Sequence, residues 1–424
     1  MAVTRDSLAS VAAAVQVAGG RVYVNDITAH RVLLYDSTLD GARVVADSSG
    51  TAANAYGTTP GTLLPFHRDS ALLVTPASLS MLVLSPAGTI ARVMAMPSSG
   101  TRGLFSLIGS IFGTPGFDAS GRLVYFLPAG VPFRGPPPQG AAMRSLEPPP
   151  SALIVRFDLT TRTLDTAGAI WIPRTSASAS RDDQGRWHMV VTAPPMATVD
   201  DWAVTSDGRI AIVRGRDYHV DWLGADGAWS STARMPFAWE HLDDDRKAAL
   251  IDSAAAMQTD FDSLQQRLER ANASGGVGGA LIVSRQAAPP GAGSSGTMTV
   301  TIASPPVGGS PSEAGPEQSR GPGPRRVTMT TPTVLKAALA DVPDYRPPFR
   351  QAAVRADADG NLWIRTTTMV DGRPVYDVVD GRGELIDRVQ LPPFRTVAGF
   401  GPGLVYMAVQ DSSGTAHLER ARIR

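Results

Sequence analysis

Gly20-Arg21-Val22-Tyr23-Val24 is the first copy of a pattern that recurs about six times along this 424-residue chain. In each copy a tight turn, usually ending in glycine, leads into a short apolar run. Clear copies return at residues 121–125, 208–212, 360–364 and 403–407, and a weaker one lies at 68–74. Such repeats are typical of a β-propeller, in which each blade buries its faces only against its neighbours.

Turn and stop signals divide the chain into blades. Asp226-Gly227 is one of several tight turns between strands. Met235-Pro236 is one of several pairs that mark the end of a blade's outer strand, because proline cannot donate a hydrogen bond to the neighbouring strand. We expect blades near residues 11–47, 61–97, 115–173, 187–236, 349–393 and 395–424. The sixth blade holds only about three strands, so we expect residues 1–10 or the start of blade one to close the ring.

These signals predict an all-β fold, a six-bladed β-propeller with a helical and low-complexity insertion between blades four and five. The predicted divisions are 1–236 for blades one to four, 237–345 for the insertion and 346–424 for blades five and six, which close the ring with the N-terminus. The insertion begins with an amphipathic helix whose apolar residues step by three and four: Leu250, Ala254, Met257, Phe261, Leu264 and Leu268.

Asp243, Asp244 and Asp245 are placed to cap the start of this helix. Its apolar seam is expected to pack on the propeller, with a partner helix as the alternative. The stretch from Ser274 to Arg326 is rich in Gly, Pro and Ser, so we expect it to be mostly disordered, with β-like runs at 280–283 and 298–302.

Composition excludes several classes of function. The chain has 39 basic and 39 acidic residues and 6% aromatic residues, which argues against a nucleic-acid groove. The basic residues are almost all arginine, which we attribute to a GC-rich genome. Cysteine is absent, so a thiolate nucleophile or a disulfide is impossible.

No stretch approaches the roughly 18 apolar residues of a membrane span, and Met1 to Ser10 lack the apolar core of a signal peptide. A periplasmic or secreted location is expected if an upstream leader is missing.

The candidate site lies at the entrance to blade four and in its second turn. Asp217, His219 and Asp221 alternate along one strand and therefore share a face. Together with Asp201 and Arg214 they form a candidate ligand-binding cluster, in which His219 is a possible base or the carboxylates bind a cation. The alternative is that these residues bridge neighbouring blades. The segments 128–150 and 237–345 are expected to crowd the same end of the channel.

Two stretches resemble the NHL-like and TolB-like six-bladed propellers, among them uncharacterised bacterial proteins: residues 20–26 leading to 30–36, and residues 358–364. The resemblance specifies architecture and leaves the activity open. Propeller lactonases bind a divalent metal through a Glu in the first blade, whereas this chain has no Glu before Glu147. Zinc-dependent lyases on NHL propellers use three His, for which no matching motif is found here.

Three functions are compatible with these features of the sequence. The first is a non-catalytic scaffold that binds a peptide, glycan or protein, with no cofactor and as a monomer. The second is a metal-dependent hydrolase or lyase with Ca²⁺ or Zn²⁺ in the channel. The third is a subunit of an envelope complex of the TolB type.

Overall fold

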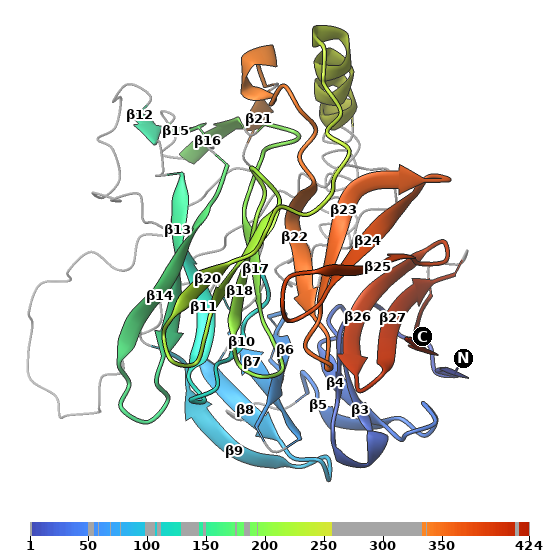
Figure 1. Ribbon diagram of the computed structural model, residues 1–424. Coiled ribbons are helices and arrows are strands. Elements are labelled where there is room, and N and C mark those ends of the chain that lie inside the picture. The colour runs from blue at the N-terminus through green and yellow to red at the C-terminus, as the bar shows by residue number, and fades with distance from the viewer. Residues whose placement is uncertain are drawn as a thin grey trace, which may run out of the picture.

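A ring of six four-stranded blades forms the body of the protein (Figure 1). The protein is represented by a computed structural model, which describes residues 2–49, 55–57, 59–67, 69–76, 78–97, 107, 112–128, 144–146, 150–173, 176–181, 187–192, 194–256, 333–335, 337–411 and 415–423. The six-bladed propeller that the repeat predicts is therefore confirmed.

The first three blades follow one another along the chain, each running from an inner to an outer strand. Blade one contains β2 (Val11–Gln16), β3 (Val22–Asp26), β4 (Arg31–Tyr35) and β5 (Arg43–Ala46). Blade two contains β6 (Thr62–Phe66), β7 (Ser70–Thr75), β8 (Ser80–Leu84) and β9 (Ile90–Ala95). Blade three contains β10 (Gly116–Phe117), β11 (Leu123–Pro128), β13 (Ser151–Phe157) and β14 (Leu164–Trp171).

The last three blades complete the ring. Blade four contains β17 (Asp201–Val204), β18 (Ile210–Arg214), β19 (His219–Leu223) and β20 (Trp229–Ser231). Blade five contains β22 (Phe349–Ala356), β23 (Leu362–Val370), β24 (Arg373–Val379) and β25 (Leu385–Gln390). Blade six contains β26 (Arg395–Gly401), β27 (Leu404–Gln410), β28 (Ala416–Arg422) and, as its outer strand, β1 (Ala2–Val3).

The ring is closed by its N-terminal strand. β1 pairs antiparallel with β28, so that Ala2 faces Arg420 and Val3 faces Glu419. The amide of Thr4 continues this pairing with a 3.0 Å hydrogen bond to the carbonyl of Leu418. Blade six therefore combines strands from both ends of the chain.

The core lies between the blades, because both faces of each sheet are buried. The largest apolar cluster joins blades three, four and five around Trp202, Tyr218 and Phe349, none of which is exposed. Five of the six turns that launch a second strand use a glycine with positive φ, and blade two uses Asp69. At Gly208, φ is +82° and an added Cβ would lie 2.1 Å from the amide nitrogen of Ala119 in blade three. The turns thus allow neighbouring blades to approach closely.

A seventh sheet stands apart from the ring, at the top of Figure 1. Its strands are β12 (Arg144–Leu146), β15 (Ser176–Arg181), β16 (Trp187–Thr192) and β21 (Thr333–Leu335). They come from three separate connections that leave the ring at one end: the turn between β11 and β13, the link from blade three to blade four, and the insertion. The prediction that blade four begins at residue 187 is wrong, because residues 187–192 pair with β15 and β21 and the blade begins at Asp201.

The insertion begins with a helix, described over residues 244–256 and drawn at the same end of the propeller (Figure 1). Asp243 caps it, since its carboxylate accepts a 2.9 Å hydrogen bond from the amide of Arg246. Leu250 and Ile251 pack against Met196, Leu242 and Val342. The rest of the expected seam, from Met257 onward, and the two β-like runs at 280–283 and 298–302 lie outside the described residues. Among the described residues, no helix is long and apolar enough to span a membrane.

Candidate functional site

Arg214 is the centre of the polar cluster in blade four. Its guanidinium contacts the Oδ2 atoms of Asp200 and Asp221, at 2.7 Å each. It also donates a 3.0 Å hydrogen bond to the carbonyl of Ala169, and Asp200 accepts one of 2.9 Å from the amide of Trp171. Burial alone would lower the pKa of Arg214, but its hydrogen bonds to the two carboxylates raise it above its ordinary value. The cluster therefore ties blade four to the outer strand of blade three.

His219 lies between two carboxylates of the same cluster. Its Nδ1 atom is 2.8 Å from Oδ1 of Asp217, and its Nε2 atom is 3.2 Å from Oδ1 of Asp221. Asp221 also accepts a 2.5 Å hydrogen bond from the hydroxyl of Ser231. Burial would raise the pKa of Asp221, but the hydrogen bonds from Ser231 and Arg214 hold it below its ordinary value. Asp221 is thus an ionised partner for both Arg214 and His219.

Asp201 does not join this cluster, although it is the next residue after Asp200. Its carboxylate is fully buried and accepts hydrogen bonds from the amides of Gly113, Ala353 at 2.7 Å and Val354 at 2.9 Å. Burial raises its pKa to about 7, while the amide hydrogen bonds act in the opposite direction. The structure therefore brings together Arg214, Asp217 and His219, and it places Asp201 in a separate contact among blades three, four and five.

The geometry of the cluster does not form a metal centre. Asp217 and Asp221 approach different nitrogens of the His219 ring, so the ring separates the two carboxylates. Among the residues that the structure describes, no group of three His, Asp or Glu side chains converges in a way that would hold a metal ion.

Tyr218 makes a contact that the sequence pattern did not indicate. It occupies a left-handed conformation with φ of 53°, and its hydroxyl donates a 2.7 Å hydrogen bond to Asp377 of blade five. Asp377 is also 3.1 Å from the guanidinium of Arg388. Burial is the largest of the effects that raise the pKa of Tyr218. A positive φ at a tyrosine is costly, and this buried inter-blade hydrogen bond supports it.

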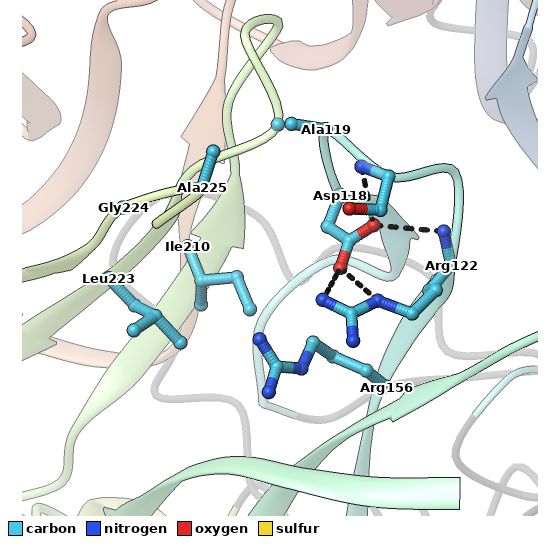
Figure 2. Close-up of a pocket in the computed structure, with 10 residues that line it drawn as sticks. Asp118, Ala119, Arg122, Arg156, Ile210, Leu223, Gly224 and Ala225 are labelled. Carbon is cyan, nitrogen blue, oxygen red and sulfur yellow. Dashed lines mark hydrogen bonds and ion pairs between the residues drawn. The ribbon is translucent and has the colours of Figure 1, made fainter. Parts of the chain in front are cut away.

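A hollow lies between blades three and four at the opposite end of the propeller, and it measures about 240 Å³ when the open solvent at its mouth is included. Figure 2 shows Asp118 bound to Arg122, with Arg156 beside them and Ile210 and Leu223 across the gap. Arg122 is 2.8 Å from Asp118, and Arg156 is 2.7 Å from Asp165. Both arginines of this hollow therefore have an acidic partner within the protein.

A second hollow lies between blades five and six, and none of its residues was predicted from the sequence. Arg365 and Tyr376 line it from the paired strands β23 and β24. The available signal is the charged Arg365 that follows the buried run Leu362-Trp363-Ile364 in the second strand of a blade.

Comparisons with known proteins do not identify a family for this chain. No protein family and no curated protein matches the chain. Virginiamycin B lyase from Staphylococcus aureus is 8% identical with a TM-score of 0.37, over 99% of this chain and 97% of that chain. A calcium-binding protein, regucalcin, from Agrobacterium tumefaciens is 8% identical with a TM-score of 0.35, over 99% and 92%. A luciferin-regenerating enzyme is 9% identical with a TM-score of 0.38, over 98% and 92%. At these values no activity or site residue is carried over to this chain, and the NHL-like and TolB-like resemblance stays a prediction.

Proposed function

We propose that this chain is a non-catalytic binding propeller that engages a protein or peptide with the end carrying the insertions. The supporting observation is the distribution of exposed large apolar side chains. On the loops and strand ends of that end they are Leu79, Trp171, Trp239, Leu339, Tyr345, Met369, Val370 and Phe394. At the opposite end the described turns carry none, and the exposed apolar side chains at or next to a strand end are Val44, Leu164, Trp229 and Ile386. A mixture of exposed aromatic and aliphatic side chains on one face is typical of a protein interaction surface.

The absence of catalysis is part of this proposal and has its own support. The polar side chains of Arg214, Asp217 and His219 are bound to one another and to neighbouring carboxylates. A general base must have a ring nitrogen available to the substrate, whereas both nitrogens of His219 already contact a carboxylate. We therefore assign the cluster to holding blades three and four together.

Site-specific photo-crosslinking in cells that naturally express the chain tests the interaction surface. A photoreactive phenylalanine analogue replaces Trp239 at the insertion-bearing end or, as the matched control, Trp229 on an outer strand. The two side chains are similarly exposed, at 41% and 47%. We expect a cross-link to one distinct polypeptide from position 239 and none from position 229. Equal cross-linking from both positions, or cross-links from 239 only to residues 257–332 of the same chain, would refute the proposal.

Metal analysis separates this proposal from the hydrolase or lyase alternative. The purified full-length chain is assayed for bound metal and melted with and without a chelator. A stoichiometric metal whose removal lowers the melting temperature would favour the metal-dependent enzyme. A melting temperature that does not respond to the chelator is the result expected of the binding propeller.

A further inference from the structure

The hollow between blades five and six opens at the insertion-bearing end and measures about 350 Å³ when the open solvent at its mouth is included. Arg365 and Arg373 line it from blade five, and Pro392, Phe394 and Arg395 line it from the connection to blade six and the start of β26. The β23–β24 turn and this connection lie at the same end because strands alternate in direction within each blade.

The wall of this hollow is positively charged. Three of the described residues that line it are arginines, and none is acidic. Only Arg395 is fully paired, with its Nε and one terminal nitrogen 2.6 and 2.8 Å from the carboxylate of Glu419. Arg373 is 3.9 Å from Asp371, whose side chain is 82% exposed, so this pair is weak. Arg365 has no hydrogen bond or ion pair with any other residue that the structure describes.

Two more arginines without a direct acidic partner lie behind Arg365 on the inner strand β22. Burial lowers the pKa of Arg350, and the charges of Arg346 and Arg365 lower it further. Burial also lowers the pKa of Arg355, against the opposing effects of Tyr376 and Asp201. No ion pair joins Arg350 or Arg355 to an acidic residue in the described part of the chain. This region therefore holds positive charge that no described residue neutralises by a direct contact, which is an unfavourable arrangement.

Tyr376 supplies an available donor at the same place. It is paired with Arg365 across β23 and β24, and its side chain lines the hollow. Its hydroxyl makes no hydrogen bond within the described residues, and it does not belong to the fully buried polar atoms that lack a partner. A neutral hydroxyl beside guanidinium groups is suited to donate to an anion.

We propose that this hollow binds a small organic anion, whose carboxylate or phosphate group contacts Arg365, Arg373 and Tyr376. Guanidinium groups match the oxygen pairs of both kinds of anion in a bidentate manner. Apart from Thr396 the remaining wall is apolar, and Phe394 at its rim is 69% exposed. The hollow thus offers a surface for an apolar group attached to the anion, which a bare inorganic ion would not use.

Calorimetric titration of the full-length protein at constant ionic strength tests this site. Benzoate and phenyl phosphate are the probes, with inorganic phosphate and chloride for comparison. We expect one of the two aromatic anions to bind at least tenfold more tightly than inorganic phosphate. Preference for benzoate would identify a carboxylate ligand, and preference for phenyl phosphate a phosphate ester. Equal binding of inorganic phosphate and both aromatic anions, or no binding by any of them, would overturn the proposal.

Variants then locate the site. Arg365→Gln should weaken binding at least tenfold, while Arg382→Gln, which changes an exposed arginine at the opposite end of the same blade, should leave it unchanged. Without ligand, Arg365→Gln should melt at or above the wild-type temperature, because it removes unneutralised charge. Tyr376→Phe keeps the buried ring and should weaken binding several-fold, which gives a second test if Arg365→Gln does not fold. Unchanged affinity in Tyr376→Phe and in a folded Arg365→Gln protein would refute the site.

Discussion

Replacing Asp201 by alanine should be among the most destabilising single changes in the propeller. The carboxylate accepts amide hydrogen bonds from Gly113, Ala353 and Val354, which belong to blade five and to the segment entering blade three. Alanine leaves all three buried amides without an acceptor. Each such loss costs about 1–3 kcal/mol, and entry of water recovers part of it, so we expect a total loss of about 3–5 kcal/mol.

Asp201→Asn isolates the effect of protonation, because asparagine cannot titrate but keeps one side-chain oxygen that accepts hydrogen bonds. Burial raises the pKa of Asp201 to about 7 in the folded protein, from an ordinary value of 3.8. The folded state therefore holds a proton that the unfolded state releases between about pH 4 and pH 7. The stabilising contribution is complete below pH 4 and is lost as the pH rises through 7. A pKa shift of one unit corresponds to about 1.4 kcal/mol. As the pH falls from 8 to 5, the free energy of unfolding of the wild type should therefore rise by roughly 2–3 kcal/mol relative to that of Asp201→Asn.

Urea denaturation of both proteins at pH 5, 6, 7 and 8 measures this difference. Asp226→Asn, in an exposed turn of blade four, controls for the loss of a carboxylate. If the wild-type and Asp201→Asn free energies of unfolding differ by the same amount at every pH, burial does not control the protonation of Asp201. If Asp201→Ala lowers the free energy of unfolding by less than about 1 kcal/mol, the three amides find other partners and the contact does not hold the blades together.

Three further changes test other contacts. Arg214→Met should lower the free energy of unfolding in urea by about 2–4 kcal/mol, because two partly buried carboxylates lose their guanidinium partner. A decrease below about 1 kcal/mol, or an equal decrease in the exposed control Arg216→Met, would contradict this. Gly208→Val should cost at least about 2 kcal/mol in thermal melting, since its Cβ would lie 2.1 Å from the Ala119 amide. Deleting residues 2–9 should lower the melting temperature by opening blade six, and an unchanged value would show that the ring does not depend on β1.

The architecture was predictable because its signals are local. The glycines at 20, 121, 208, 360 and 403 all have positive φ, and each precedes the second strand of a blade, as the repeated pattern predicts. The capping role of Asp243 is also local, since its partner Arg246 is three residues away. Such features depend on short-range geometry that a single sequence contains.

The seventh sheet and the true partners of Asp201 were not predictable for the opposite reason. The strand Ser176–Arg181 alternates serine with alanine, so neither face has a large apolar side chain to mark it as a strand. One of its neighbours, β12, comes from a separate insertion, and β21 pairs with β16 from another. Asp201 lies next to Asp200 in sequence, yet alternation along the strand and the bend before it send the two carboxylates to different partners. The amides that bind Asp201 leave no trace in side-chain identity.

The pairing of β1 with β28 has a consequence for synthesis of the protein. Residues 2–3 leave the ribosome before the other strands of the ring, but their partners, residues 419–420, are made more than 400 residues later. The blades between them are made while β1 is still unpaired, and the ring closes only after residues 419–420 have been made. An open edge is a site for pairing with other chains, and a two-residue strand keeps the early edge short.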